Sequence, residues 1–251
     1  MRRKLFAAVV LAIVAATGLT ACGSGDDPNV LKVGTEGTYS PFSYQGSDGA
    51  LTGYDVEVVR AVADKLGRKV EFVQTPWDAI FAGLESKRFA LVANQVSITE
   101  ERKNKYELSQ PYTTSEGVIV TRAANAAITS LADLSGKTSA QSATSNWGAV
   151  ATGAGAKVEA VEGWVQAIQL LKNGRVDCTI NDSLVFDEYT KTSGDKSVKI
   201  AAQTGETSRM GFAARKGDPL IAEVNRALDE LRAEGRLAQI SDKYFGVDVS
   251  K

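Results

Sequence analysis

Charged and polar side chains that could hold a small zwitterion follow two of the strands predicted from the sequence. Residues 93–102 run from the end of one strand, through amides and hydroxyls, into a short helix that begins near Thr99 and carries Arg102. A guanidinium can donate two parallel hydrogen bonds to a carboxylate, and a helix N-terminus adds backbone donors and a favourable dipole. Asp182 directly follows the strand predicted at 175–181 and could accept from an ammonium group. These residue types predict a clamp for an anion and an acceptor for a cation.

A third strand end, at residues 137–141, leads into Thr144 and Ser145, and for all three groups a structural interpretation stays open. Thr144 or Ser145 could cap the following helix, Asp182 could cap another, and Arg102 could be a solvated helix charge beside two glutamates. Taken singly, such residues are more often structural than functional. A zwitterionic amino acid, however, needs an anion clamp, a cation acceptor and an apolar wall, and the chain offers each of them at successive strand ends.

Four aromatic residues near these strand ends are candidates for the wall of a pocket. Tyr39 and Phe42 lie in the first loop, Tyr54 precedes the first predicted helix, and Trp77 begins the second. An isolated aromatic side chain more often packs in a core, which is our interpretation of Trp77. Tyr39 and Tyr54 lie in glycine-rich loops, and we expect them to face a ligand.

The composition argues against several classes of function. The chain has 251 residues and no His, which disfavours Ser-His-Asp hydrolysis and His-ligated zinc. It has neither G-x-G-x-x-G nor G-x-x-x-x-G-K-[ST], so we expect no nucleotide cofactor, and we expect no metal. Without residues 1–21, 26 Lys and Arg face 30 Asp and Glu, whereas nucleic-acid-binding proteins are normally basic. We therefore expect no cofactor and no nucleic-acid partner.

The N-terminus has the pattern of an export signal. Residues 1–4 are basic, residues 5–16 are apolar, and Leu19-Thr-Ala-Cys22 resembles the lipobox of bacterial lipoproteins. The alternative is a short membrane anchor helix, for which the apolar run is short. The resemblance implies removal of the signal peptide 1–21, a lipid on Cys22, and a tether at 22–29. Cys178 is then left without a disulfide partner, and its β-branched neighbours predict a buried strand position.

The rest of the chain alternates between predicted strands and helices. This order predicts an α/β protein with mostly parallel sheets flanked by helices, whose ligands lie beyond the carboxyl ends of the strands. We expect Asp55 to cap the first helix and Thr75 the second, with Pro76 at its first position. The predicted strands are 30–34, 69–74, 90–94, 117–121, 137–141, 158–161 and 175–181, and the predicted helices begin near residues 55, 76, 130, 164, 219 and 240.

Six short motifs are spread over most of the chain. They are Gly34-Thr-Glu-Gly-Thr-Tyr39-Ser-Pro-Phe42, Leu51-Thr-Gly-Tyr54-Asp55, Ser97-Ile-Thr-Glu-Glu-Arg102, Pro111-Tyr112, Asn181-Asp182 and Lys243-Tyr-Phe-Gly246. As a set, they resemble the extracytoplasmic amino-acid-binding proteins of ABC importers, the solute-binding proteins of family 3. The resemblance covers residues 31–245 and implies a two-lobe periplasmic-binding-protein-like fold that closes on its ligand by hinge bending. It implies lobe 1 at 30–113 and 207–251 and lobe 2 at 114–206, with two hinge crossings near 112–115 and 205–209.

The same resemblance implies roles for individual residues. Arg102, helped by Ser97 and Thr144, would hold the ligand's α-carboxylate, and Asp182 would accept from its α-ammonium. Tyr39 and Tyr54 would line the side-chain pocket. Residues 93–98 and 180–184 are most similar to the cystine-binding branch, from which Ser97 and Cys178 are mild departures. Neutral groups would then recognise the second half of cystine, and the candidates are Asn94, Gln95, Ser145 and Asn146.

The implied function is capture of an amino acid, most favourably cystine, at the outer face of the cell membrane and its delivery to an ABC permease. We expect a monomer without enzymatic activity, attached to the membrane through the lipid on Cys22. Another polar substrate, such as glutamine or a basic amino acid, is the first alternative. A cyclohexadienyl-type dehydratase on the same fold and a lipoprotein sensor are further alternatives.

Overall fold

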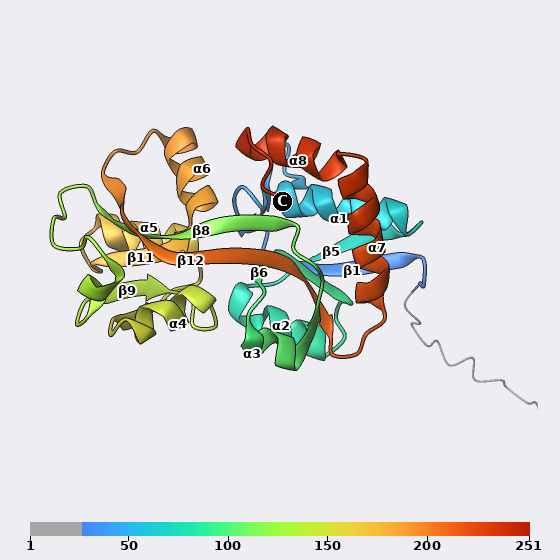
Figure 1. Cartoon of the computed structure of the whole chain (residues 1–251), viewed down its shortest axis with the longest axis horizontal. Helices are drawn as coiled ribbons and strands as arrows, with labels where there is room; N and C mark the ends of the chain where they lie inside the picture. The colour runs from blue at the N-terminus through green and yellow to red at the C-terminus, as the bar shows by residue number, and fades with distance from the viewer. Residues whose placement is uncertain (1–26) are drawn as a thin grey trace, which may run out of the picture.

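The structure is a computed structural model that describes residues 27–251 (Figure 1). The predicted signal peptide at 1–21, the lipidation of Cys22 and most of the tether lie outside the described residues. None of the helices within 27–251 combines the length and the apolar character needed to cross a membrane.

Within the described residues, one mixed sheet of nine strands runs through both halves of the molecule. Its order is β10-β9-β11-β8-β12-β6-β1-β5, and β7 pairs with β12 beside this path. The parallel pairs are β1/β5, β1/β6, β9/β10 and β9/β11, whereas β8 and β12 pair antiparallel with their neighbours. The strands are β1 (Val30–Thr35), β5 (Lys69–Gln74), β6 (Leu91–Ser97), β7 (Tyr106–Leu108), β8 (Thr113–Arg122), β9 (Thr138–Gln141), β10 (Lys157–Ala160), β11 (Cys178–Asp182) and β12 (Val198–Arg215).

The strands β8 and β12 cross from one half of the molecule to the other side by side (Figure 1). We use lobe 1 for residues 30–113 and 207–251 and lobe 2 for residues 114–206, the division predicted from the sequence. The two-lobe α/β fold is confirmed. The expectation of a separate, mostly parallel sheet in each lobe needs correction, because the crossing segments are themselves strands and join both halves in one mixed sheet. Their pairing shifts register between Gln203 and Thr207, next to the predicted crossing.

Helices cover both faces of this sheet. In lobe 1, α1, α7 and α8 pack on one face and α2 on the other; in lobe 2, α5 and α6 pack on one face and α4 on the other. The helices are α1 (Tyr54–Lys65), α2 (Trp77–Glu85), α3 (Glu100–Lys105), α4 (Asn146–Gly153), α5 (Trp164–Lys172), α6 (Ser183–Ser193), α7 (Leu220–Ala233), α8 (Arg236–Phe245) and a 3-10 helix (Leu131–Leu134). A small sheet of β2 (Thr38–Tyr39), β3 (Ser43–Gln45) and β4 (Leu51–Thr52) lies beside α1.

Three helix starts differ from the prediction, and one of them is α8, which begins at Arg236 and not near residue 240. The N-cap of α1 is Gly53, because its backbone has φ 127° and a Cβ there would lie 2.3 Å from the Phe42 carbonyl oxygen. Asp55 therefore does not cap α1 and is instead buried in its first turn. Helix α2 begins at Trp77 after Pro76, and Thr75 does not cap it.

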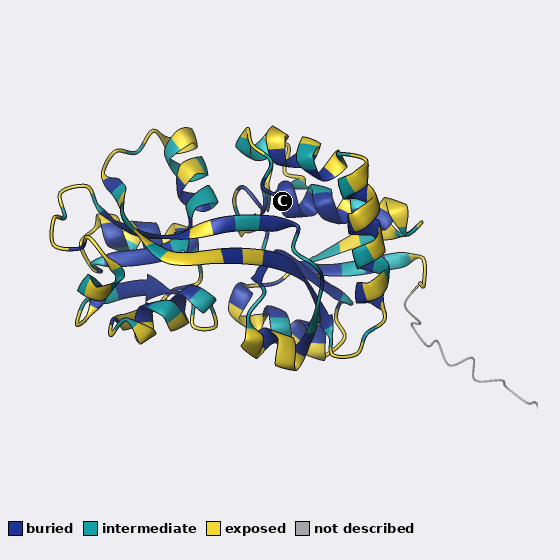
Figure 2. Cartoon of the chain, in the orientation of Figure 1, coloured by how far each residue is buried: buried dark blue, intermediate teal, exposed yellow. Residues whose placement is uncertain are grey.

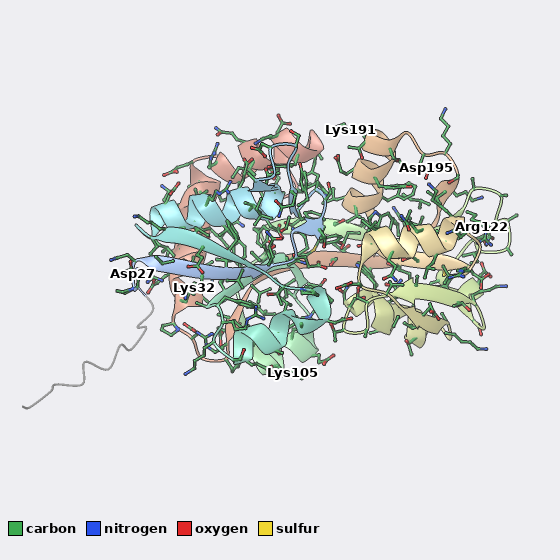
Figure 3. The ribbon with its side chains drawn as sticks, turned by 180° about the vertical axis from the view of Figure 1, so that it is seen from behind. Asp27, Lys32, Lys105, Arg122, Lys191 and Asp195 are labelled. Atoms are coloured by element: carbon green, nitrogen blue, oxygen red, sulfur yellow. The ribbon has the colours of Figure 1, made fainter. Side chains whose placement is uncertain are left out.

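The core follows the alternation expected of strands covered on both faces. Along β8, Val118 and Val120 join the cluster under α5 and α6, while Ile119 joins the cluster under α4. The strands are mostly buried and the outer sides of the helices are exposed (Figure 2). Charged side chains such as Lys105 and Lys191 project from the outer surface of the two lobes (Figure 3).

Candidate functional site

A cavity of about 600 Å³ lies between the lobes, where the carboxyl ends of β1, β6, β9 and β11 meet. This is the edge at which α/β sheets normally bind ligands. Among residues 27–251, no Lys or Arg lines it. Lobe 1 contributes Glu36, Tyr39, Trp77, Asn94 and Gln95 among others, and lobe 2 contributes Gln141, Ser145, Asn146, Trp147, Trp164, Glu162, Asn181 and Asp182.

Two carboxyl groups with raised pKa values line this cavity from opposite lobes. Asp182 is 3% exposed, and burial raises its pKa to about 7 although Trp147 Nε1 donates to its Oδ2 at 3.3 Å. Glu36 is half-buried as a residue, but desolvation of its carboxyl raises the pKa to about 7, and Asn94 Nδ2 donates to its Oε2 at 2.5 Å. A nearby cation would lower both pKa values, since an opposite charge favours the ionised form. The cavity can therefore stabilise positively charged groups on a ligand.

Three buried polar atoms of the cavity wall have no hydrogen-bond partner within residues 27–251. They are Trp77 Nε1, Gln95 Oε1 and Asp182 Oδ1, one donor and two acceptors. Buried polar atoms are nearly always paired, and leaving one unpaired costs about 1–3 kcal/mol. These atoms can be satisfied by a ligand that carries both an acceptor and ammonium donors.

The structure decides between the alternatives for Asp182 and Ser145. Asp182 precedes α6, but its side chain makes no capping hydrogen bond to that helix, so its carboxylate is available to the cavity. Ser145 does cap α4, with its Oγ accepting from Gly148 N at 2.9 Å, and it also lines the cavity. The predicted capping role of Ser145 is therefore confirmed.

Arg102 is not a solvated helix charge, because it is 8% exposed. Its Nη1 donates to the Ser97 carbonyl at 3.0 Å and its Nη2 to the Thr144 carbonyl at 3.4 Å. The guanidinium lies over the rings of Trp77 and Phe81 at 5.2 and 5.7 Å, and burial lowers its pKa to about 10. The two carbonyl hydrogen bonds and the contacts with the two rings require a planar cation with several N–H donors, which a guanidinium provides.

The structure does not bring Arg102, Ser97 and Thr144 into the cavity of Asp182. These three residues line a neighbouring hollow of about 1160 Å³, which shares Ser145, Asn146 and Trp147 with the first. The clamp on the ligand carboxylate thus stays a prediction. Trp77 and Asn146, in contrast, line the same cavity as Glu36 and Asp182.

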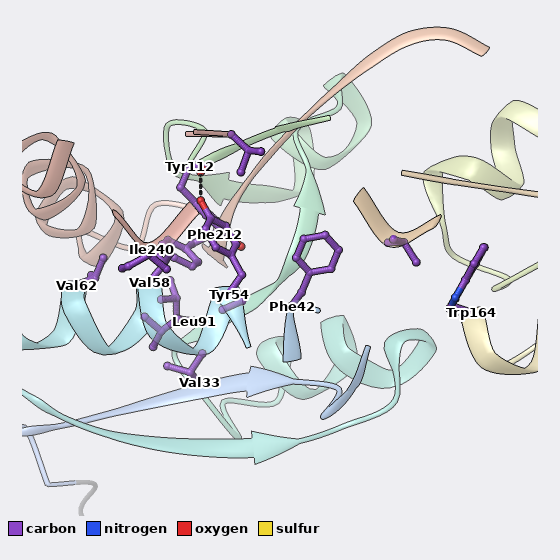
Figure 4. Close-up of a cluster of buried hydrophobic side chains, with 14 of the residues drawn as sticks. Val33, Phe42, Tyr54, Val58, Val62, Leu91, Tyr112, Trp164, Phe212 and Ile240 are labelled. Carbon is purple, nitrogen blue, oxygen red and sulfur yellow. Dashed lines mark hydrogen bonds between the residues drawn. The ribbon is translucent and has the colours of Figure 1, made fainter. Parts of the chain in front are cut away.

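Tyr54 was expected in the ligand wall, but the structure places it in the core of lobe 1. Its side chain is 0% exposed and its hydroxyl donates to the Tyr112 carbonyl at 2.8 Å (Figure 4). It stacks on Tyr112 at 6.1 Å between ring centroids. Tyr54 is the first residue of α1, and the start of that helix at Gly53 turns the ring inward. Tyr39, in contrast, does line the cavity.

Sequence reasoning missed Glu36 and Asp78. Glu36 follows β1, so the rule that singled out the other strand ends could have found it. Asp78 was interpreted as part of a helix start, but it reaches across the cleft. Its carboxylate accepts from Ala143 N at 3.2 Å, from Thr144 N at 3.0 Å and from Thr144 Oγ1 at 2.7 Å.

Further hydrogen bonds also join the lobes. Tyr39 Oη donates to Asn181 Oδ1 at 2.8 Å, and Ser97 Oγ donates to Asn146 Oδ1 at 3.0 Å. With those of Asp78, they hold the cleft in a closed arrangement. Contacts of this kind join elements far apart in the chain, so the spacing of the residues could not reveal them.

Replacing Asp78 by Ala should open the ligand-free protein. Its three hydrogen bonds lie at an exposed rim, so we expect a loss of about 1 kcal/mol, a roughly fivefold shift toward the open form. Small-angle X-ray scattering of the ligand-free variant should give a larger radius of gyration than the wild type. Asp64→Ala, an exposed acid on α1, is the matched control. Equal scattering of all three proteins would show that Asp78 does not hold the cleft.

Cys178 is the free cysteine of the described residues and is fully buried. Its thiol lies 3.9 Å from the Thr138 carbonyl, and burial raises its pKa to about 11. The thiol is therefore protonated at neutral pH and poorly nucleophilic. Residues 27–251 contain no group of three or more His, Cys, Asp or Glu arranged to bind a metal ion.

Known proteins resemble this chain in sequence and fold. The L-cystine-binding protein TcyA of Bacillus subtilis (strain 168) is 51% identical over 271 residues, which cover 100% of both chains. The L-cystine solute receptor of Neisseria gonorrhoeae, in its unliganded open conformation, is 43% identical, with a TM-score of 0.60 over 88% of this chain and 94% of the receptor. An ancestral arginine-binding protein bound to arginine is 37% identical, with a TM-score of 0.81 over 87% of this chain and 99% of that protein.

The family model of the bacterial extracellular solute-binding proteins, family 3, matches residues 31–247. This match spans both lobes and every residue of the cavity wall. The chain therefore belongs to the bacterial extracellular solute-binding proteins of family 3.

Proposed function

We propose that this protein binds an amino acid with two ammonium groups, L-cystine foremost, in the cavity between its lobes and delivers it to an ABC permease. The observation that carries the proposal is the pair of desolvated carboxyl groups, Glu36 and Asp182, on opposite walls of a cavity that no described Lys or Arg lines. One ammonium would lie at each acid. One carboxylate of cystine would accept from neutral donors such as Trp77 Nε1 and the Asn94 and Asn146 amides.

Relatives support this substrate. Both the Bacillus subtilis protein and the gonococcal receptor are named for L-cystine. The closed arrangement also fits capture of a ligand. The arginine-bound protein superposes with a TM-score of 0.81, whereas the more similar sequence of the gonococcal receptor superposes in its open form with only 0.60.

The cellular setting of the proposal follows from the family and from the N-terminal sequence. Family 3 proteins are extracellular solute-binding proteins, so the chain acts outside the cytoplasm. We propose that a lipid on Cys22 anchors it to the outer face of the cell membrane and that it acts as a monomer without catalysis. We propose that Arg102, helped by Ser97 and Thr144, holds the other carboxylate of the ligand. Tyr39, Asn94, Gln95 and Ser145 then line the remaining wall.

Thermal denaturation of residues 23–251 against a panel of free amino acids tests the proposal. A ligand at 100 times its Kd stabilises the folded state by about 2.7 kcal/mol, which raises Tm by roughly 5–10 °C in a protein of this size. We expect this shift with L-cystine and none with L-cysteine, which has one ammonium group. A shift with L-cysteine of equal size would contradict the need for two ammonium groups.

A basic amino acid is the second candidate, and the same two acids favour it. Arginine and lysine carry a second cation on the side chain, and the arginine-bound structure has the same fold. Competition of L-arginine and L-lysine against L-cystine separates the two. Displacement of L-cystine by micromolar L-arginine would move the assignment to basic amino acids.

A further inference from the structure

The buried side chain of Asp55 does not line the cavity, but it makes hydrogen bonds to Gln95, a residue that does. Asp55, in the first turn of α1, is 0% exposed and is absent from the lining. Its Oδ2 accepts from the backbone N of Gln95 at 2.8 Å, and its Oδ1 accepts from Gln95 Nε2 at 2.5 Å. Both oxygens are thus committed to one residue.

Gln95 has an unusual conformation and an unpaired atom. Its φ is 49°, which costs a residue with a Cβ about 1–2 kcal/mol. Its Nε2 also donates to Thr113 Oγ1 at 3.2 Å, at the start of the crossing strand β8. Its Oε1 is buried, belongs to a residue of the cavity wall and has no partner among the described residues. Strained residues of this kind persist where the surroundings hold them and are frequent at ligand sites.

The acceptors around Nε2 determine which way the amide points. Both oxygens of Asp55 accept here, so the carboxyl group faces the NH2 end of the Gln95 amide and the carbonyl end points away from Asp55. We propose that Asp55 is a positioning residue for amino-acid binding: it holds the Gln95 amide so that Oε1 accepts a hydrogen bond from an ammonium of the ligand. This inference rests on the proposed function, since it requires a ligand with an ammonium group.

The substitution Asp55→Asn would reverse the amide while keeping the shape of the side chain. The backbone N–H of Gln95 cannot turn, so the new side-chain amide must present its oxygen there and its NH2 to the Gln95 side chain. The Gln95 amide then has to flip and present NH2 donors to the cavity, where they oppose an ammonium. Loss of one hydrogen bond to a charged group predicts a roughly 10- to 30-fold weaker affinity.

A double-mutant cycle on L-cystine binding, measured by isothermal titration calorimetry, tests the inference. Asp55→Asn and Gln95→Met should each weaken binding roughly 10- to 30-fold, and Asp55→Asn should weaken it less than about threefold further in the Gln95→Met protein. A purely structural role of Asp55 would give the same loss in both backgrounds and would overturn the inference. Asp133→Asn is the matched control, because Asp133, like Asp55, accepts from backbone N–H, here of Thr129 and Ser130, but lies in a distant turn.

A measurement on the wild type covers the case in which Asp55→Asn does not fold. The Gln95 NH2 protons should exchange slowly with solvent in NMR spectra, with and without ligand, because both are hydrogen-bonded. Fast exchange would overturn the inference. If L-cystine does not bind the wild type at all, the proposed substrate fails, and the same cycle is measured with the amino acid of the panel that does bind.

Discussion

Asp182→Asn should abolish most binding of the amino acid while leaving the fold intact. Asp182 is the most buried of the three acids that line the cavity, and its Oδ1 has no partner within residues 27–251. Removing one partner of a buried charge pair costs about 3 kcal/mol or more, which is roughly 150-fold in Kd. Titration calorimetry with L-cystine measures the loss. Asp187→Asn, an exposed acid on α6, should bind as the wild type does.

The same variant should change how stability depends on pH. The folded-state pKa of Asp182 is raised from 3.8 to about 7 by burial, so the folded state holds this proton more tightly than the unfolded chain. The contribution of this carboxyl group to the stability of the ligand-free protein is therefore fully present below about pH 4. It is lost as the pH rises to about 7. Glu36 and Asp55 add the same trend. Tm measured without ligand should fall between about pH 4 and pH 7, level off above that, and fall less steeply in Asp182→Asn. An identical pH profile would show that Asp182 is ionised without cost in the folded state.

Arg102→Lys should produce the other large loss. The guanidinium donates to carbonyls of both lobes and lies on the Trp77 ring, which lines the cavity. An ammonium cannot make both hydrogen bonds and lie flat on the ring, and hydrogen bonds from charged groups contribute about 1.5–3 kcal/mol each. We expect affinity for L-cystine to fall roughly 30- to 100-fold.

The control for Arg102 is another arginine with the same kinds of contact. Arg60 donates to the Leu51 carbonyl at 3.2 Å and lies over Phe72 at 5.7 Å, on the outside of lobe 1. Arg60→Lys should leave binding unchanged.

Comparing the affinities of L-cystine and its diamide shows whether Arg102 binds the ligand carboxylate or only joins the lobes. If Arg102 binds the ligand carboxylate, the preference for L-cystine over the diamide should shrink in Arg102→Lys; if it only joins the lobes, both ligands should lose equally.

Local patterns of the sequence predicted much of the local structure. The capping box of Ser130 and Asp133 and the N-caps Thr99 and Ser145 are all confirmed, because a cap depends on residues within four positions. The strands predicted at the centre of the sheet, among them β6, β8 and β11, are confirmed as buried, whereas β10 and β5 at its two ends are exposed or half-buried. Prediction erred where a neighbour distant in sequence decided the outcome. Gly53 starts α1 because of the Phe42 carbonyl, and that start turns Tyr54 into the core.

In the candidate site, too, local patterns were predicted correctly and contacts between distant residues were not. Six of the residues predicted for the site do line the cavity, and most of them were found because they follow the end of a strand. They are Tyr39, Asn94, Gln95, Ser145, Asn146 and Asp182. Nothing in the spacing of Arg102 and Asp182 could show that they would line different hollows, since the closure of one lobe on the other sets their separation.

By itself, the sequence determined most of the strands and helices, several N-caps, the family and the residue types at the strand ends, because these depend on periodicity and on short-range hydrogen bonding. It did not reveal β7 (Tyr106–Leu108) or the long crossing strand β12 (Val198–Arg215). Only the tertiary structure decided which groups share a cavity, which acids are desolvated enough to have a pKa of about 7, and that Asp78 joins the lobes. Burial and contacts across the cleft depend on elements far apart in the chain, and these are set only when the sheet and its two lobes come together.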